Sequence, residues 1–467
     1  FKNIKKIIGM NFCPLGNHKH FSMQDDIKPK KKLLLATIEN IDQEGRGVTH
    51  IDGKAIFVEG ALQGELVECE SYVKKPSYEI AFTERVIRQS NLRVKPKCEH
   101  FNRCGGCSMQ HFEFQAQIAA KQRVFENTLS RIGKVKTETI LTPLAGPSWH
   151  YRYKGRLRVK FVVKKNKALV GFNEKRTHFI ADISSCEVLP QTLSDILPQL
   201  QDLITQLSIK DKIPQIEFAA DQNHLVLVLR ILDVLNTNDE LLLNTFSSQH
   251  PVQFWTQSKG PDTIKPLSQR DDVKLSYALK EFGLRFSFMP YDFTQINPFI
   301  NQVLVRRAMS LLKPSKDDRI FDFFCGLGNF TLPIATSGAK VMGIEGSASL
   351  IERAKQCRDE NHLNDFVEYQ CMNLFEITKE SLLKLGHANK WLIDPPRDGA
   401  FQLVQLIDND IQPSVIVYVS CNPATLARDA QILVHEKGYK LDKAGIVNMF
   451  PHTSHVESIA LFVKTES

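Results

Sequence analysis

The C-terminal part of the chain alternates short apolar runs with helix-like stretches. From about residue 286 onward this alternation predicts a doubly wound parallel sheet. One run, 415–419, has the length and composition of a buried strand, and Asn422-Pro423 ends it before a helix-like stretch at 424–433. Ligands of open α/β sheets bind at the carboxyl ends of the strands. The residues that follow each strand are therefore the first candidates for chemistry.

The earlier part of the chain has a different pattern. Between about 33 and 90, short β-like runs are separated by glycines, a spacing that predicts a small barrel. Residues 1–32 predict a flexible basic lead, and residues 91–285 mix helix-like and strand-like stretches in a central α+β domain. We therefore expect a lead at 1–32 and three domains, at 33–90, 91–285 and 286–467.

Composition and charge agree with a protein of several domains. The chain has 467 residues, and the usual domain size suggests about three domains. Its 42% hydrophobic and 24% charged residues are those of a soluble globular protein, and no apolar run approaches the roughly 20 residues of a membrane span. The first residues lack the apolar core of a signal peptide, so we expect a cytoplasmic protein. Separately, we expect the protein to be a monomer. A net charge of +8 hints at a polyanionic partner.

Ten cysteines are scattered through the chain, unlike the dense framework of a small secreted domain. Three of them, Cys98, Cys104 and Cys107, lie close together with glycines between them, and Cys186 is the expected fourth ligand. Four thiolates fit either tetrahedral zinc or an iron–sulfur cluster, and the spacing alone does not choose between them. The trio lacks the C-x3-C-x2-C spacing of radical S-adenosylmethionine enzymes. Three independent structural cysteines are the remaining alternative.

A row of cations lies between these ligands. If 151–161 is a strand, its period of two places five cations on one face: Arg152, Lys154, Arg156, Arg158 and Lys160. Like charges along one strand face repel one another, which favours a phosphate backbone as their partner over a solvated outer strand.

The first strand of the C-terminal part predicts a cofactor site. Residues 319–331 read as strand, glycine turn and helix, and Glu345 closes the next strand. An acidic side chain about twenty residues past such a turn can accept hydrogen bonds from both hydroxyls of a ribose. Neither G-x-G-x-x-G nor G-K-[ST] is present in full, so S-adenosylmethionine, which lacks a pyrophosphate, fits better than a dinucleotide or a nucleoside triphosphate.

Three further motifs lie at the ends of apolar strands. Cys421, after the strand at 415–419, is the candidate nucleophile, and Asp394 begins an Asp-Pro-Pro-Arg sequence at the end of another strand. The third motif, 449–459, leads into the final strand and carries two histidines and Glu457. The chain closely resembles the RNA uracil-C5-methyltransferase family at 293–297, 322–330, 393–399, 418–425 and 450–458. The segment 41–67 resembles the TRAM domain, an OB-like barrel found on RNA-modifying enzymes.

The resemblance covers almost the whole chain and is nearest to the bacterial 23S ribosomal RNA branch of that family. It implies a Rossmann-like class I methyltransferase domain, a central RNA-binding domain and 23S ribosomal RNA as the partner. It also favours a [4Fe-4S] cluster over zinc on the four cysteines. The S-adenosylmethionine pocket that it implies is lined by Gln295, Phe324, Asn329, Glu345, Asn373 and Asp394.

The expected chemistry explains why these residue types are needed. Carbon 5 of uracil is a poor nucleophile until a thiolate adds to carbon 6, and Cys421 would supply that thiolate. The resemblance assigns removal of the carbon 5 proton to Glu457, with His452 and His455 as alternatives. Asp394 would orient the uracil or the cofactor. Arg397 is a candidate RNA contact, and the target nucleotide is expected to flip out of the RNA.

Other functions fit the sequence less well. The RNA cytosine-C5 family carries its nucleophile in a Pro-Cys after the strand-end Asp, and Asp394-Pro-Pro-Arg has no cysteine. An amino-group methyltransferase would have an aromatic residue in the place of Arg397. Transfer-RNA uracil methyltransferases typically lack both TRAM and the cysteine set. A non-catalytic RNA-binding module would have no use for Cys421 and Glu457 beside a cofactor pocket.

Overall fold

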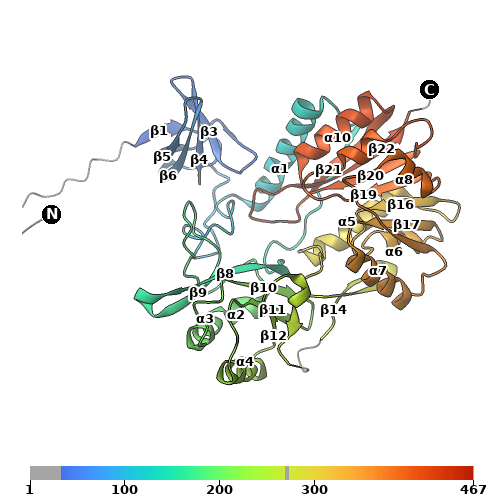
Figure 1. Cartoon of the computed structure of the whole chain (residues 1–467). Helices are drawn as coiled ribbons and strands as arrows, with labels where there is room; N and C mark the ends of the chain where they lie inside the picture. The colour runs from blue at the N-terminus through green and yellow to red at the C-terminus, as the bar shows by residue number, and fades with distance from the viewer. Residues whose placement is uncertain (1–32, 269–272, 466–467) are drawn as a thin grey trace, which may run out of the picture.

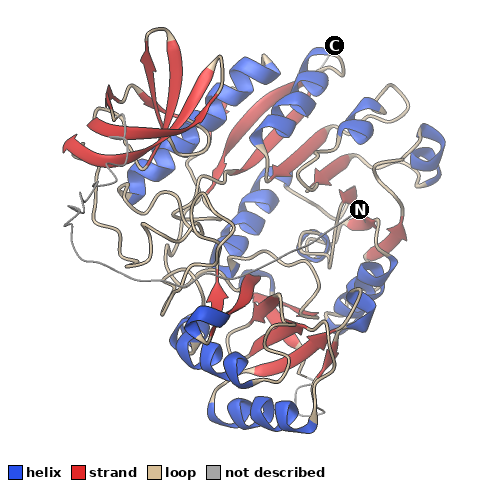
Figure 2. Cartoon of the chain, turned by 60° about the vertical axis from the view of Figure 1, so that its left-hand side comes forward, coloured by secondary structure: helices blue, strands red, loops and turns tan. Residues whose placement is uncertain are grey.

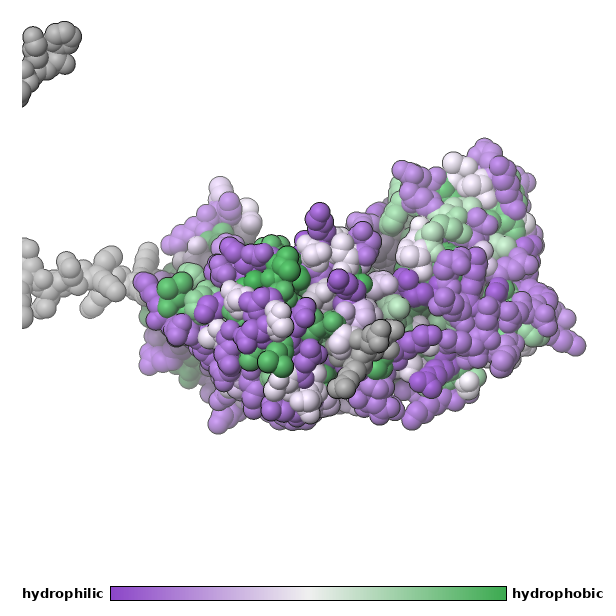
Figure 3. Space-filling model, turned by 60° about the horizontal axis from the view of Figure 1, so that its bottom comes forward, coloured by the Kyte–Doolittle hydropathy of each residue, from purple (hydrophilic) through white to green (hydrophobic). Residues whose placement is uncertain are grey.

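The computed structural model describes residues 33–268 and 273–465. Three large sheets, of six, six and eight strands, follow one another along the chain, and a two-stranded hairpin lies between the second and the third (Figure 1). The expected basic lead at 1–32 lies outside the described residues. In the described ranges no helix is both long and apolar enough to cross a membrane. The face drawn in Figure 3 is mostly hydrophilic, with separate hydrophobic patches.

The first sheet closes on itself. Its two edge strands, β1 and β2, are consecutive pieces of the segment 34–41; β1 pairs with β5 and β2 pairs with β3, so this segment joins the two edges. The side chains of Val58, Val67 and Ala81 are fully buried inside. A small barrel was expected here. Its strands are β1 Leu34–Thr37, β2 Asn40–Ile41, β3 Gly47–Ile51, β4 Lys54–Glu59, β5 Leu66–Lys74 and β6 Tyr78–Arg88.

The central sheet has helices on one face (Figure 2). Its order is β13-β12-β11-β10-β8-β9, and the β11–β12 pair is parallel because the helix α4 makes the crossover between them. The strands are β8 Lys154–Val162, β9 Lys167–Gly171, β10 Gln215–Ala220, β11 Leu225–Arg230, β12 Gln253–Gln257 and β13 Lys265–Pro266. The helices are α2 Gln191–Asp195, α3 Leu197–Gln206 and α4 Thr237–Gln249.

The third sheet is mixed, whereas the sequence predicted a parallel one. Its order is β18-β17-β16-β19-β20-β22-β21-β7, and β22 runs antiparallel to both of its neighbours. The connection between β21 and β22 is too short for a crossover helix, so the last strand returns antiparallel. The main strands are β16 Arg319–Phe323, β17 Lys340–Glu345, β18 Val367–Cys371, β19 Lys390–Ile393, β20 Val415–Ser420, β21 Tyr439–Val447 and β22 Glu457–Lys464.

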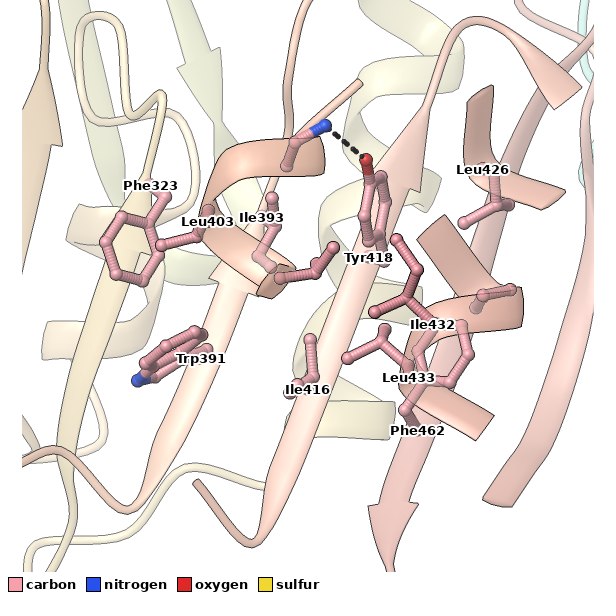
Figure 4. Packing of buried hydrophobic residues seen from close by; sticks show 14 of the residues in the cluster. Phe323, Trp391, Ile393, Leu403, Ile416, Tyr418, Leu426, Ile432, Leu433 and Phe462 are labelled. Atoms are coloured by element: carbon pink, nitrogen blue, oxygen red, sulfur yellow. Dashed lines mark hydrogen bonds between the residues drawn. The ribbon is translucent and has the colours of Figure 1, made fainter. Parts of the chain in front are cut away.

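Helices cover both faces of this sheet. One hydrophobic core holds side chains of α8, α9 and α10, and another, on the opposite face, holds those of α5, α6 and α7. Their bounds are α5 Pro298–Leu312, α6 Thr331–Ala335, α7 Ala348–Glu360, α8 Lys379–Lys384, α9 Phe401–Gln405 and α10 Pro423–His435. In the first core, Trp391, Ile416 and Phe462 from the sheet pack with the helix residues Leu403 and Leu433 (Figure 4).

A piece of the chain from before the central sheet also belongs to this third unit. The helix α1, Phe114–Thr128, buries Ile118 and Phe125 in the core that α10 shares, and β7, Thr139–Ile140, pairs with β21 at the edge of the sheet. The pattern along the chain predicted that these residues belong to the central domain, 91–285. Since the contacts join residues about 300 positions apart, the pattern along the chain did not reveal them.

Candidate active site

A cavity of about 520 Å³ lies at the carboxyl ends of β16, β17, β19 and β20. This is the edge at which a doubly wound sheet binds its ligands. The cavity is lined by most of the residues that the sequence predicted for cofactor binding and catalysis: Gln295, Phe324, Glu345, Asn373, Asp394, Arg397, Cys421 and Glu457.

Asn329 is the exception among the predicted cofactor residues, because it does not line this cavity. Its side-chain amide exchanges hydrogen bonds with that of Asn301 on α5 (2.8 and 2.9 Å) and accepts one from the hydroxyl of Tyr277 (3.0 Å). In this structure Asn329 therefore joins the glycine turn to the helix α5 and to the hairpin strand β14, Leu275–Leu279.

The glycine turn after β16 shapes one wall of the cavity. Phe324 and Gly326 both have positive φ angles, +62° and +54°. Gly328 has φ +90°, and a Cβ there would lie 2.6 Å from the hydroxyl oxygen of Tyr369, so only glycine fits. The Gly326 N–H donates to Glu345 Oε2 (3.2 Å), and the Ser347 N–H donates to Oε1 (3.0 Å). The carboxylate is thus fixed at the end of β17 with lone pairs left for a ligand.

Cys421 is the first residue after β20, and the helix α10 begins two residues later. The Asn422 side chain caps α10 by accepting the Ala424 N–H (3.0 Å) and donates to the Arg397 carbonyl (3.1 Å). Burial, followed by the charges of Glu457 and Asp394, raises the pKa of the Cys421 thiol to about 11, and Arg397 opposes this rise. The thiol therefore rests protonated and needs a base, or a change in its surroundings, before it can attack.

Glu457 begins β22 beside Cys421. Only 7% of its surface is exposed, and its Oε2 atom has no hydrogen-bond partner within the described residues. Burial and the charge of Asp394 raise the pKa of the Glu457 carboxyl to about 8, while Lys121 lowers it. A carboxyl with a pKa in this range, aimed into a cavity, is suited to accept a proton near neutral pH.

Asp394 is the first residue after β19 and lines the same cavity as Glu345 and Glu457. Its N–H donates to the Phe323 carbonyl (3.2 Å), and burial raises the pKa of its carboxyl to about 7. Under the same edge lies Asp322, which the sequence analysis did not single out. It is fully buried, accepts a hydrogen bond from the Thr331 hydroxyl (2.5 Å) and has a pKa that burial raises to about 8. Asp322 itself does not line the cavity, so it adds a buried carboxyl group beneath the three that do, Glu345, Asp394 and Glu457.

The connection between β21 and β22 is held by α1. The Gln117 Oε1 atom accepts the His452 N–H (3.0 Å), and the Lys121 ammonium donates to Asn448 Oδ1 (2.7 Å) and to the Phe450 carbonyl (2.9 Å). Sequence reasoning missed both helix residues. Their spacing in the sequence could have indicated them, because both polar residues lie on the buried face of α1 that includes Ile118.

The two histidines of this connection have different surroundings. His452 is buried, stacks on Trp149 with 3.8 Å between ring centroids, and does not line the cavity, whereas His455 does. Burial and the charge of Lys121 lower the pKa of His452 to about 4. His452 thus has a packing contact of its own, and His455 is the one of the two that reaches the site.

The four predicted cysteine ligands come from two segments, and all four are free thiols. Cys186 is part of the hydrophobic core of the central sheet, and Cys104 and Cys107 pack against it. Gly106 lies between the latter two, where a Cβ would lie 3.1 Å from the ring of Phe172. Within the described residues, no group of three or more His, Cys, Asp or Glu side chains has an arrangement that could hold a metal ion.

The predicted cationic strand is β8, but its five cations do not share one open face. Arg156, Arg158 and Lys160 are exposed, and the alternate residues Leu157 and Val159 are buried, as period two requires. Two of the five have other surroundings. Arg152 precedes the strand and stacks over Phe172, and Lys154 is mostly covered, donates to the Asp292 carbonyl, and has a pKa that burial lowers to about 8.

Two of the exposed cations of this strand, Arg156 and Arg158, line a second cavity together with residues of the barrel. This cavity, of about 580 Å³, lies where the barrel, the cysteine segment and β8 meet. Arg156 in its lining pairs with Glu217 (2.7 Å). The other cations of the lining are Arg46, Arg158, Lys175 and Arg176.

Comparison with known proteins gives the same family as the motifs. Residues 113–465 match the family model described as tRNA (Uracil-5-)-methyltransferase. Proteins named 23S rRNA (uracil(1939)-C(5))-methyltransferase RlmD are similar over most of their length. The protein from Chromobacterium violaceum is 52% identical over 92% of this chain and 85% of its own, and that from Aromatoleum aromaticum is 53% identical over 92% and 99%.

A solved structure shows the same fold. The Pyrococcus abyssi tRNA (uracil-54, C5)-methyltransferase in complex with S-adenosyl-L-homocysteine superposes with a TM-score of 0.71 at 23% identity, covering 92% of this chain and 99% of that one. The expected α/β methyltransferase fold is thereby confirmed. With a family match over most of the chain and relatives at about half identity, the chain belongs to the RNA uracil-C5-methyltransferase family.

Proposed function

We propose that this protein methylates carbon 5 of a uridine in 23S ribosomal RNA, with S-adenosylmethionine as the methyl donor. The observation that carries the proposal is the placement of Cys421 and Glu457 side by side at one cavity, together with Asp394. Substitution at carbon 5 of uracil requires a nucleophile that adds to carbon 6 and a base that removes the proton from carbon 5. The relatives named above support ribosomal RNA as the substrate and, with it, a cytoplasmic enzyme.

Cys421 would start the reaction. Its sulfur adds to carbon 6 of the flipped uracil, which makes carbon 5 electron-rich. When bound, S-adenosylmethionine supplies the electrophilic methyl group that carbon 5 takes. The place of Cys421 between β20 and α10 fixes the sulfur at the cavity wall, and Arg397 is the cation that favours the thiolate form.

Glu457 would finish the reaction. Once carbon 5 carries both the methyl group and its original hydrogen, the carboxylate accepts that proton. The electrons of the C–H bond restore the ring double bond, and the bond from carbon 6 to sulfur breaks. A buried oxygen of Glu457 without a hydrogen-bond partner in the described chain is free for this task, and His455 is the alternative base in the same cavity.

The cavity also suits S-adenosylmethionine itself. Glu345 is held by two backbone N–H groups and can accept both hydroxyls of a ribose. Phe324 and Phe375 line the same region with ring centroids 5.7 Å apart, which offers an apolar surface for an adenine. Gln295, Asn373 and Asp394 supply polar groups around it. Asn329 would act indirectly, through Asn301 and the glycine turn.

For the four cysteines we propose a [4Fe-4S] cluster. The thiols of Cys98, Cys104, Cys107 and Cys186 are close enough to raise one another's pKa values, after the larger effect of burial. Gly106, one of the two glycines between Cys104 and Cys107, lets the segment pack closely on Phe172. A cluster bound there would join the segment 98–107 to the central sheet near Cys186, and thereby brace two distant parts of the chain.

The remaining parts are proposed to bind RNA. The closed sheet at 34–88 has the strand order and the parallel β4–β6 pair of an OB-like barrel, which supports a TRAM domain at 33–90. Arg156 and Arg158 would contact phosphates in the cavity between this barrel and the central domain, at 91–285. Lys160, exposed further along β8, would contact the same RNA backbone. Arg397, exposed at the mouth of the catalytic cavity in the domain at 286–467, would contact RNA near the flipped base.

Methyl transfer to defined RNAs tests the proposal. The purified protein is incubated with S-adenosylmethionine labelled in its methyl group and, separately, with unmodified 23S ribosomal RNA and unmodified transfer RNA. We expect label in 5-methyluridine of 23S ribosomal RNA. If only transfer RNA becomes labelled, the substrate is transfer RNA, the other known substrate class of this family. Label in cytidine would refute the uracil mechanism.

A further inference from the structure

Residues 289–297, all of them described by the structure, form a loop that contains neither helix nor strand. The loop joins β15, Leu284–Phe288, to α5, and it carries the side chains of Phe293 and Gln295 to the catalytic cavity. Helical turns and strand ladders therefore do not fix the position of these side chains. Contacts with the neighbouring elements must do so.

Asp292 makes several of these contacts. The residue is 2% exposed; its Oδ2 atom accepts the Met289 N–H (2.9 Å), and its own N–H donates to the Met289 carbonyl (2.9 Å). Its carbonyl accepts a hydrogen bond from the ammonium of Lys154, the first residue of β8. Just before that strand, the Tyr153 N–H donates to the Ile296 carbonyl (2.8 Å). The loop is thus attached to the strand that carries the proposed RNA contacts.

The Asp292 carboxylate also reaches α7. Its Oδ1 atom lies 2.5 Å from Nη2 of Arg353, and the guanidinium lies over the ring of Tyr291, 5.3 Å from its centroid. The helix α7 begins three residues after Glu345, the proposed acceptor of the ribose hydroxyls. A guanidinium stays charged at any pH that the protein meets. The loop is therefore held by an ion pair to the helix that follows the cofactor strand.

We propose that Asp292 is a positioning residue for methyl transfer: by joining the loop to Arg353 of α7 and to Lys154 of β8, it fixes Gln295 at the cofactor. This inference rests on the proposed function, in which Gln295 is one of the polar groups around S-adenosylmethionine. Asp292 is not among the residues that line the cavity, so it acts through the loop. A displacement of about 1 Å in such a group can slow a reaction by about two orders of magnitude.

A second buried ion pair in the same unit provides the matched control. Asp318 Oδ2 lies 2.8 Å from the Lys390 ammonium, and their side chains are 7% and 16% exposed, against 0% and 18% for Asp292 and Arg353. Asp318 precedes β16 and Lys390 begins β19, so this pair lies at the amino ends of the strands, away from the cavity. Loss of either carboxylate should destabilise the fold, since each leaves a largely buried cation unpaired.

The test compares full-length Asp292→Asn and Asp318→Asn with wild type. Calorimetry measures the affinity for S-adenosylhomocysteine, and hydrogen exchange measures the opening of the backbone at 289–297. Both variants should melt at a lower temperature. Asp292→Asn should also weaken ligand binding about tenfold, exchange faster at 289–297 and transfer methyl groups about tenfold more slowly with saturating cofactor. Asp318→Asn should match wild type in these three measurements.

A second arm asks whether Asp292 acts through Gln295. In a Gln295→Ala background the side chain that the loop positions is already absent, so adding Asp292→Asn should weaken binding no more than about twofold further. Arg353→Lys keeps a cation opposite Asp292 and should retain most of the wild-type affinity. If Asp292→Asn does not fold, as judged by circular dichroism, Arg353→Gln breaks the same pair from α7 and is read in the same way.

Three results would overturn the proposal: wild-type binding and loop exchange in Asp292→Asn, equal losses in Asp318→Asn, or a further tenfold loss in the Gln295→Ala background. Failure of the proposed function gives a different result. Wild-type protein that methylates no uridine would refute that function, whereas the exchange and melting measurements would still decide whether Asp292 holds the loop.

Discussion

Cys421 and Glu457 lie at the same end of two neighbouring antiparallel strands, each one position beyond the paired residues Ser420 and Ser458. In antiparallel strands, positions equally far past a pair remain opposite one another. The proposed nucleophile and the proposed base are therefore held by one strand pair, although they are 36 positions apart in the chain. This arrangement lets each be removed without displacing the other.

Replacing Cys421 with alanine should reduce the rate of methylation at least about a thousandfold, because carbon 5 of the uracil is then not activated. Binding of S-adenosylmethionine, measured by calorimetry, should be unchanged, and 5-fluorouridine RNA should no longer form an adduct. Cys371→Ala is the matched control, since Cys371 is an exposed cysteine at the end of β18 outside the cavity lining. Uracil methylation by Cys421→Ala would show that the nucleophile is another residue.

Replacing Glu457 with glutamine should stall the reaction after methyl transfer. The variant should accumulate an RNA–protein adduct that carries the labelled methyl group and survives denaturing electrophoresis. Glu436→Gln, at an exposed glutamate after α10, should behave as wild type. Normal turnover by Glu457→Gln would assign proton removal elsewhere, and His455→Gln is then the next variant to measure.

The same substitution should stabilise the fold at alkaline pH. The pKa of Glu457 is raised by burial to about 8 from an ordinary value of 4.5, so the folded state binds this proton more tightly than the unfolded state does. Stability from this group is complete below about pH 4.5 and is lost as the pH rises towards 8. Glutamine does not ionise, so Glu457→Gln should melt a few degrees above wild type at pH 8.5 and within about one degree of it at pH 4.5. Equal melting temperatures at both values would show that Glu457 has no raised pKa.

Neutralising Arg158 and Lys160 together should weaken RNA binding and reduce the slope of log affinity against log salt by about one to two units, without changing cofactor affinity. These two cations are exposed on β8. Lys384→Gln with Lys440→Gln, a pair of exposed lysines in the third unit, controls for net charge. If both double variants change the slope equally, the strand does not bind the RNA backbone.

Protein purified without oxygen should be brown and contain about four irons per chain. Cys107→Ser and Cys186→Ser should each lose the colour and the iron and lower the melting temperature, because the cluster is expected to join the segments that carry them. Cys371→Ser should retain both. A colourless protein with one zinc per chain would assign a tetrahedral zinc site instead.

Much of the site was predictable because its residues are in short motifs next to strong strand patterns. The run at 415–419 became β20, and Cys421, Asp394 and Glu345 lie at strand ends, as the breaks in apolar pattern indicated. The misplaced residues depend on distant contacts. Lys154 has the period of an exposed cation, yet the Asp292 loop, about 140 positions away, covers it. Asn329 is in the expected glycine turn, but Asn301 engages its side chain.

The sequence by itself determined the classes of element, the barrel, the family and most of the residues that meet at the cavity, because periodicity, glycine turns and strand-end motifs are local properties. Only the tertiary structure decided that α1 and β7 join the third sheet, that β22 returns antiparallel, and that Lys121 reaches the connection before Glu457. Each of these depends on which surfaces pack across hundreds of residues. Burial then shifts the pKa values of the ionisable groups involved. Neither the packing nor these shifts can be predicted from any single stretch of the chain.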